Sequence, residues 1–139
     1  MNIKEIQNEI VAEFSMFDDW MERYEYIIEL GKGLPLIAEE FKTEDNIIKG
    51  CQSKVWVHAE EKEGKVFFSS DSDAILTKGI IAILIRTFSN QTPANILEAN
   101  TDFIDEIGLK EHLSATRANG LVSMIKKIKM YALAFEARN

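Results

Sequence analysis

The sequence contains very few of the side chains that form disulfides or bind soft metals. It has one cysteine, Cys51, and two histidines, His58 and His112, among 139 residues. A lone cysteine cannot form an internal disulfide, so nothing in the sequence implies an oxidising compartment. A zinc or iron–sulfur site needs several thiolate or imidazole ligands, and these three residues do not supply such a set.

Excess positive charge and long apolar runs are also missing. The 16 Lys and Arg residues are outnumbered by 23 Asp and Glu residues, which gives a formal net charge of −7. This balance argues against nucleic acid and anionic membrane surfaces as partners, because both attract basic clusters. The longest apolar run, Gly79 to Ile85, is too short to span a bilayer, and "MNIKEIQNEI" lacks the basic start and apolar core of a signal peptide. We therefore expect a reduced, cytoplasmic protein.

What is present is the composition of an ordinary globular protein. Hydrophobic residues make up 46% of the chain and charged residues 28%. A chain of this length folds as one domain and buries roughly two-thirds of the surface that its unfolded form exposes. The sequence has no linker, repeat or low-complexity segment, so we expect a single domain over residues 1–139.

Several segments have the periodicity of helices. Apolar residues recur at three- and four-residue steps from Ile3 to Phe17 and again from Trp20 to Ile28. Asp19 can cap the second of these helices, and Gly31 can end it in the left-handed conformation. Three further helices are expected, namely an apolar and buried one over Ile75–Phe88, a short one from Thr92-Pro93 through Leu97, and a long last one carrying Leu121, Ile125, Ile128, Tyr131, Ala132 and Phe135.

A different period follows Cys51. From Lys54 to Glu60 apolar and polar residues alternate, "EKEGK" supplies a turn, and "VFFSS" returns from Val66 as a second strand. Ile47 and Ile48 can add a short third strand. Helices, a small antiparallel sheet and then more helices indicate an α+β domain, with about three strands packed against several helices.

Cys51 lies at an element boundary, between Gly50 and the polar run Gln52, Ser53 and Lys54. A buried structural thiol is one interpretation, since free cysteine is often buried. A dithiol enzyme is excluded because no second cysteine exists, and a cysteine hydrolase needs a histidine close to Cys51 in space. A third possibility is a thiolate that takes up or passes on one group, with the second thiol on another protein.

Six sequence blocks resemble the SufE family of sulfur acceptors in the same order and spacing. "GCQSKVW" (residues 50–56) is similar to the family's active loop. The other blocks are "LPLI" (34–37), "SDSDA" (70–74), "KGIIAIL" (78–84), "TPANIL" (92–97) and "LSATRANGLVSMI" (113–125). The similarity covers nearly the whole chain.

The resemblance implies a specific activity. SufE-type proteins accept persulfide sulfur from a pyridoxal-phosphate-dependent, SufS-type cysteine desulfurase, stimulate that enzyme, and pass the sulfur towards iron–sulfur cluster assembly on a scaffold such as a SufB-containing complex. The fold is shared with IscU-type scaffolds, but this chain lacks their additional cysteine ligands. Cys51 is then the persulfide acceptor of a covalent carrier that needs no cofactor of its own, and the free protein is a monomer or weak homodimer. Two alternatives remain, a self-contained cysteine hydrolase and a non-catalytic interaction module with an incidental cysteine.

The resemblance also points to residues around the loop. Gly50 gives the loop backbone freedom, and Gln52 and Ser53 can donate hydrogen bonds to a sulfur anion. Their simpler interpretation is turn and strand-start polarity.

Three more candidates for partner binding lie further along the chain. Arg117 and Asn119 belong to "TRANG" at the start of the last helix, and Asp73 precedes the buried helix. Arg117 can stabilise a thiolate or bind the desulfurase, or can be a solvated helix-end residue. Asp73 has helix capping as its default role. Gly120, inside a helix, is expected to mark close packing.

Overall fold

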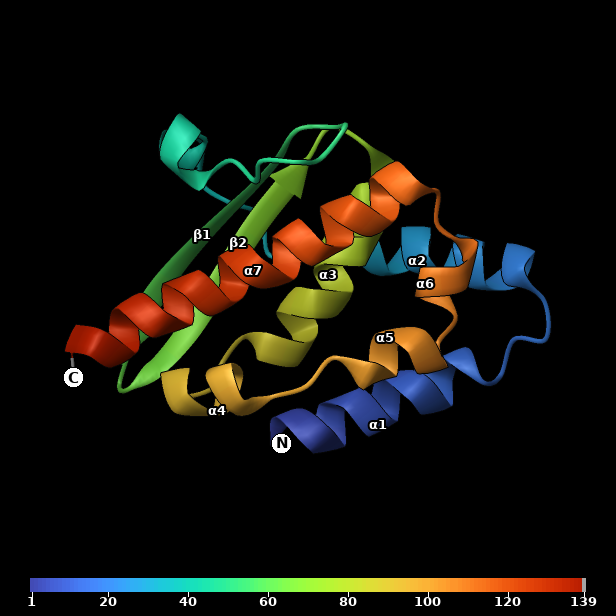
Figure 1. The fold of residues 1–139 in the computed structure, drawn as a ribbon, viewed down its shortest axis with the longest axis horizontal. Helices are drawn as coiled ribbons and strands as arrows, with labels where there is room; N and C mark the ends of the chain where they lie inside the picture. The colour runs from blue at the N-terminus through green and yellow to red at the C-terminus, as the bar shows by residue number, and fades with distance from the viewer. Residues whose placement is uncertain (139) are drawn as a thin grey trace.

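The structure is a computed structural model that describes residues 1–138. Two helices precede a β-hairpin, and further helices follow it (Figure 1). The elements are α1 (Ile3–Phe14), α2 (Trp20–Gly31), the short 3-10 helices η1 (Glu39–Phe41) and η2 (Glu44–Asn46), β1 (Val55–Lys62), β2 (Lys65–Ser72), α3 (Ile75–Phe88), α4 (Pro93–Glu98), α5 (Asp102–Glu106), α6 (Leu109–His112) and α7 (Ala115–Arg138). The α+β class predicted from the sequence is confirmed.

The first two helices begin at side-chain caps. Asn2 accepts a hydrogen bond from the Glu5 N–H, and the Glu5 side chain accepts one from the Asn2 N–H, which completes a capping box. Asp19 accepts a hydrogen bond from the Glu22 N–H, as expected from the sequence. These caps fix where each helix begins, because they satisfy N–H groups that lack a partner within the helix.

The hairpin pairs β1 with β2 in antiparallel register, from Val55 opposite Ser72 to Lys62 opposite Lys65. Glu63 and Gly64 form its two-residue turn, both with positive φ, as hairpin turns of this length prefer. Within residues 1–138 the sheet has two strands rather than about three. Ile47 makes only an isolated bridge to Trp56, because the chain turns away at Lys49 and Gly50 directly after Ile48 donates its N–H to the Val55 carbonyl at 2.8 Å.

Two glycines let α2 and α3 approach closely. A Cβ at Gly79 would lie 2.1 Å from the Ile27 carbonyl oxygen, and one at Gly31 would lie 2.9 Å from the Gly79 nitrogen. Gly31 does not have positive φ, so the expectation of a left-handed helix end is wrong. Its small size serves helix packing instead.

The core lies between the hairpin, α3, α7 and the N-terminal helices. α7 runs beside the hairpin along much of its length (Figure 1), and α3 is buried over nearly all its residues. The largest fully buried side chains are Ile10, Phe14, Ile27, Ile81, Ile83, Leu84, Ile85, Phe88, Ile96, Ile107, Leu109 and Ile128. Among residues 1–138, none of the helices combines the length and the apolar character needed to cross a membrane.

Candidate functional site: the cysteine loop

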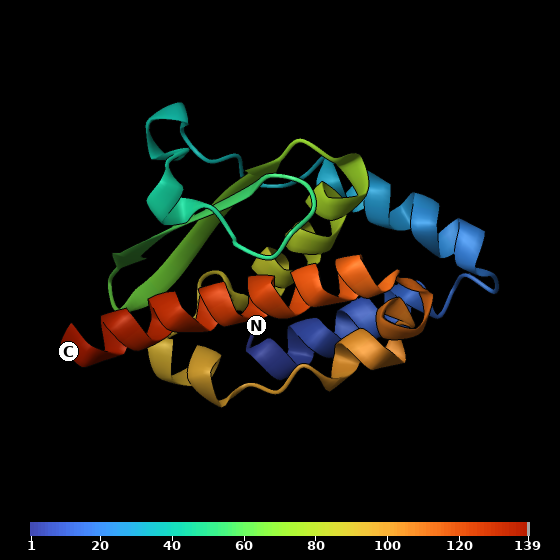
Figure 2. The ribbon, with the colours of Figure 1, turned by 45° about the horizontal axis from the view of Figure 1, so that its top comes forward.

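A cavity of about 350 Å³ opens beside Cys51. Three parts of the chain form it: the loop before β1, the start of α3 and the first turns of α7. Figure 2 shows this loop passing over the N-terminal half of α7. The lining residues are Cys51, Gln52, Ser53, Asp73, Ala74, Thr77, Ile80, Thr116, Arg117, Gly120 and Met124.

Cys51 itself is half-buried and packs against the core. Its Sγ lies 3.7 Å from the Gly120 carbonyl oxygen, to which the thiol donates a hydrogen bond. A Cβ at Gly120 would lie 3.2 Å from that sulfur, so the expected close packing at Gly120 is confirmed. Burial raises the pKa of the Cys51 thiol. Burial in this position therefore favours the thiol over the thiolate.

The loop is fixed on both sides of the cysteine. Gly50 has a φ of +92°, and a Cβ there would lie 2.9 Å from Ser123 Oγ on α7, so both conformation and space favour glycine. Ser53 Oγ lies 3.1 Å from Thr77 Oγ1 and forms a hydrogen bond with it. These contacts join the loop to α7 and to α3.

Asp73 holds the end of the hairpin. Its backbone N–H donates to the Lys54 carbonyl at 3.2 Å, and its carboxylate accepts the Lys54 N–H at 3.0 Å. The expectation that Asp73 caps α3 is wrong, since the cap position is Ala74 and makes no side-chain cap hydrogen bond. The Asp73 carboxylate instead binds the backbone of Lys54, the residue that follows the cysteine loop, and so holds the end of that loop in place.

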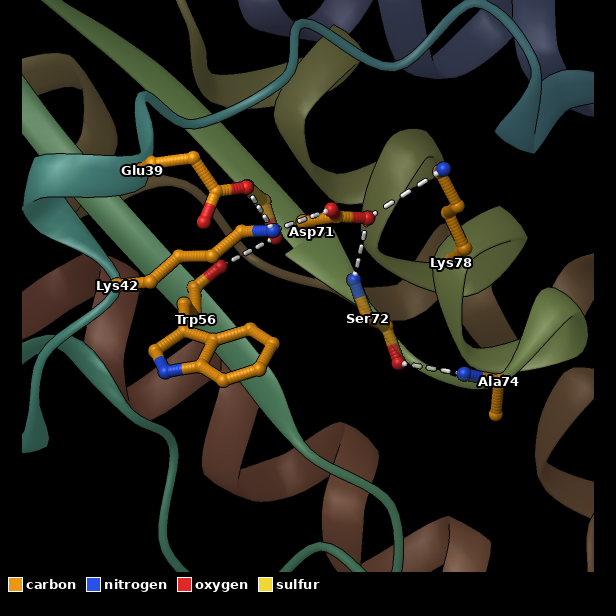
Figure 3. A network of polar contacts seen from close by, with 8 residues as sticks. Glu39, Lys42, Trp56, Asp71, Ser72, Ala74 and Lys78 are labelled. Atoms are coloured by element: carbon orange, nitrogen blue, oxygen red, sulfur yellow. Dashed lines mark hydrogen bonds and ion pairs between the residues drawn. The ribbon is translucent and has the colours of Figure 1, made fainter.

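An ion-pair network surrounds Asp71, two residues before Asp73 in the sequence (Figure 3). Asp71 accepts Lys42 Nζ at 3.0 Å and Lys78 Nζ at 3.3 Å, and Lys42 also reaches Glu39 at 2.9 Å. Burial acts to raise the pKa of Asp71, but hydrogen bonds from Lys42, the Ser72 N–H and Lys78 outweigh it and hold that pKa below its usual value. The network ties η1 and α3 to the end of β2.

The structure brings together four of the candidates around Cys51. Gln52, Ser53, Asp73 and Arg117 line the cavity. Gly50 shapes the loop without lining the cavity, and Asn119 is exposed on α7 outside the lining.

The sequence did not identify Thr77 and Thr116 as lining residues. Thr77 is a buried polar residue near the start of a mostly apolar helix, and that contrast was the one available signal. Nothing in the local sequence marks Thr116, because its position in the cavity lining depends on how α7 packs against the loop.

The arrangement suits a thiol that acts without help from a neighbouring base. Neither histidine lines the cavity: His112 packs on Trp20 and the Gly108 carbonyl, and His58 stacks on Phe41. Within residues 1–138, no three His, Cys, Asp or Glu side chains come together in a way that could hold a metal ion. The polar side chains that line the cavity with Cys51 are hydroxyls, an amide, the Asp73 carboxylate and the Arg117 guanidinium.

Comparisons with known proteins relate this chain to one family. Residues 8–132 match the SufE family model, described as an Fe-S metabolism associated domain. An uncharacterised SufE-like protein of Rhizobium meliloti is 41% identical over 130 residues, which cover 90% of this chain and 93% of that protein. "SufE-like protein 1, chloroplastic/mitochondrial" of Arabidopsis thaliana is 37% identical over 131 residues, which are 94% of this chain but 35% of the longer plant protein.

A solved structure shares the fold. The solution structure of a hypothetical protein from Thermus thermophilus superposes with a TM-score of 0.77 at 20% identity, covering 93% of this chain and 94% of that one. The family match over residues 8–132 and the identity to the SufE-like relatives show that the chain belongs to the SufE family.

Proposed function

We propose that this protein is a sulfur carrier of iron–sulfur metabolism. Cys51 takes persulfide sulfur from a pyridoxal-phosphate-dependent cysteine desulfurase of the SufS type, and the carrier stimulates that enzyme and passes the sulfur to cluster assembly. The pyridoxal phosphate belongs to the partner, and the recipient is a scaffold such as a SufB-containing complex. The carrier works in the cytoplasm.

The observation that carries the proposal is the setting of the single cysteine. Cys51 is half-buried beside a cavity of about 350 Å³, with Ser53, Thr77 and Arg117 among the lining residues. A second sulfur atom on Cys51 can lie in this space, where hydroxyl groups and a guanidinium can stabilise a persulfide anion. Half-burial also limits the access of small thiols, which otherwise remove sulfane sulfur.

The transfer is an exchange between sulfur atoms with no net oxidation. The Cys51 thiol loses its proton to solvent, and the thiolate attacks the terminal sulfur of the desulfurase persulfide. A new S–S bond forms at Cys51 Sγ, the S–S bond within the partner breaks, and its electron pair leaves on the partner's cysteine as a thiolate. Because burial disfavours the thiolate in this position, outward movement of the loop promotes the attack, and Gly50 provides the backbone freedom for this motion.

Intact-mass analysis tests the proposal directly. The protein is incubated with a SufS-type desulfurase, pyridoxal phosphate and cysteine, and its mass is measured with and without a thiol reductant. We expect added sulfur-atom masses that the reductant removes, and a faster desulfurase turnover. Cys51→Ser should gain no sulfur and lose the stimulation, whereas Ser123→Ala, which keeps the cysteine, should still gain sulfur.

The two alternatives predict different results, one for Cys51→Ser in this experiment and one for an assay without any partner. An interaction module with an incidental cysteine retains full stimulation as Cys51→Ser, and that result would contradict the carrier mechanism. A self-contained cysteine hydrolase cleaves a small acyl substrate without any partner. The position of both histidines outside the cavity lining speaks against the hydrolase.

A further inference from the structure

The two outer edges of the hairpin differ in how far other parts of the chain cover their backbone groups. On the outer edge of β2, the Val66 N–H donates to the Gln91 carbonyl, the Phe68 N–H to Ser89 Oγ, and the Ser70 N–H to the Pro35 carbonyl. These partners cover that edge along most of its length. The outer edge of β1 is covered at its start, where Ile48 donates to the Val55 carbonyl and Tyr131 Oη donates to the Val57 carbonyl.

The strand register identifies the next outward-facing residue on β1 as Ala59. In an antiparallel pair, alternate residues direct both backbone groups away from the neighbouring strand. Val55 and Val57 do so, since their carbonyls accept hydrogen bonds from Ile48 and Tyr131, and Ala59 follows in the same alternation. Within residues 1–138 the outward N–H and C=O of Ala59 have no hydrogen-bond partner. An uncovered edge of this kind is a template for another strand.

A groove of about 860 Å³ lies along this stretch of β1. One wall is the segment that contains Phe41 and Asp45, and the other is the C-terminal half of α7 with Tyr131 and Phe135. Ala59 lines the groove through its backbone, because its methyl group faces the core with the side chains of Val55 and Val57. The groove therefore presents a free backbone donor and acceptor between two partly apolar walls.

The charges along the groove favour a basic occupant. Asp45, Glu60 and Glu61 contribute three carboxylates, and Arg138 is the one Lys or Arg among the lining residues. Arg138 lies over the Phe135 ring, and Lys127, which is not a lining residue, donates to the Asp45 carbonyl at 2.8 Å.

His58, on the same strand, lies beside one of these carboxylates. Its Nε2 is buried without a hydrogen-bond partner among the described residues, and the Glu60 carboxylate is its ion-pair partner at 3.4 Å.

We propose that the β1 edge groove, lined by Ala59, Asp45, Glu60, Tyr131 and Phe135, binds an extended basic segment of a partner polypeptide as a third β-strand. The segment pairs with the backbone of Ala59 and continues the line that the Ile47 bridge begins. Its alternate side chains lie against the aromatic walls, and its lysine or arginine side chains face the Asp45 and Glu60 carboxylates. Such strand addition takes affinity from main-chain hydrogen bonds and specificity from alternate side chains. The site is separate from Cys51, so Cys51→Ser should bind the segment unchanged.

Nuclear magnetic resonance on the full chain tests this proposal with defined probes. The first probe is a blocked five-residue peptide of alternating lysine and valine, the second replaces lysine by glutamate, and the third is the basic peptide with its backbone nitrogens methylated. Titration of the Ala59 amide shift gives Kd for each peptide. At a basic-peptide concentration of about ten times Kd, exchange of the Ala59 N–H with solvent should slow about tenfold. The glutamate and methylated peptides should cause neither change.

A matched pair of variants tests the charge argument. Asp45→Lys should weaken binding of the basic peptide, whereas Glu98→Lys, the same kind of reversal on α4 outside the groove, should leave it unchanged. The proposal is overturned if the basic peptide leaves the Ala59 amide unchanged at millimolar concentration, or if all three peptides act alike. It is also overturned if the Ala59 amide responds to protein concentration without peptide, because the occupant is then a second copy of this chain.

Discussion

At the scale of the residue, Cys51 is held in a setting that favours its protonated form. Burial raises its pKa, and the thiol donates its hydrogen bond to the Gly120 carbonyl, an acceptor that a thiolate cannot use. Arg117 lines the same cavity but makes no hydrogen bond or ion pair with the sulfur. The resting loop therefore shields part of the thiol and favours its protonated form.

This setting predicts the pH dependence of Cys51 alkylation. The rate of reaction with iodoacetamide follows the thiolate fraction, so its midpoint reports the pKa of the thiol. The midpoint should lie at higher pH for the native protein than for the same chain unfolded in urea, where an ordinary thiol has a pKa of about 8.5. A lower native midpoint would show instead that Arg117 or another group stabilises the thiolate in the resting loop.

The same shift has a consequence for stability, and its sign can be stated. The native thiol has the higher pKa, so as pH rises the unfolded chain loses this proton first. The contribution of Cys51 to the free energy of unfolding is therefore present below the unfolded pKa and declines as pH rises through the native pKa. In Cys51→Ala this part of the alkaline decline should be missing from urea-unfolding measurements.

At the scale of the element, the contact between α2 and α3 depends on two glycines that the helical pattern did not assign to packing. Gly79 lies under the Ile27 carbonyl, and Gly31 lies against the Gly79 backbone. The buried helix α3 carries Thr77 and Ile80 into the cavity, so its position against α2 also sets the floor beneath Cys51. Packing far from the cysteine thus determines the shape of the site.

Gly79→Ala should be strongly destabilising. The added Cβ would lie 2.1 Å from the Ile27 carbonyl oxygen, a backbone atom that cannot move away alone. We expect the free energy of unfolding to fall by about 2–4 kcal/mol, more than the gain of about 1 kcal/mol that alanine brings to a helix. Urea unfolding followed by circular dichroism gives the value.

Gly33→Ala is the matched control for this prediction. Its φ is not positive, and the nearest atom to an added Cβ is the Leu30 carbonyl oxygen at 3.7 Å, an ordinary contact. It should be neutral or stabilising by about 0.4–1 kcal/mol, because alanine restricts the unfolded chain. Equal losses for Gly79→Ala and Gly33→Ala would contradict the close α2–α3 contact.

The elements were predictable where the pattern is local. Asp19 caps α2 as expected, α3 spans Ile75–Phe88, and the strands follow the alternation after Lys54. The third strand failed because Ile47 and Ile48 suit a strand, but their pairing ends where Gly50 turns the chain. The motif of the SufE family identified Gln52, Ser53 and Arg117, whereas Thr116 came to the cavity through the docking of α7, which no local signal encodes.

At the scale of the whole molecule, charge is distributed unevenly. α7 carries five basic residues and one acidic residue, a net charge of +4, so the rest of the chain carries −11. The N-terminal turns of this basic helix flank the Cys51 cavity, where Arg117 is exposed. If a partner binds at this end of α7, an acidic surface on that partner is attracted to the helix. Such attraction raises the association rate more than it slows dissociation.

Two substitutions on α7 separate local contact from overall charge. Under the proposed function, Arg117→Glu should slow association with the desulfurase severalfold and weaken the dependence of that rate on salt, because it removes a cation at the Cys51 cavity. Lys126→Glu changes the charge of the molecule by the same amount. Lys126 is exposed, makes no hydrogen bond or ion pair among the described residues, and lies nine residues along the helix, on the opposite face. Association rates are measured by stopped-flow fluorescence at several salt concentrations.

The comparison distinguishes three arrangements of the complex. A slower rate for Arg117→Glu alone places the partner at the cavity end of α7, over the residues that hold Cys51. Equal slowing in both variants indicates attraction to the charge of α7 as a whole, with no contact at Arg117. Unchanged rates in both would remove α7 from the approach path and leave the loop and the Asp71 network as the surface that the desulfurase meets, since that network joins η1, β2 and α3 next to Asp73.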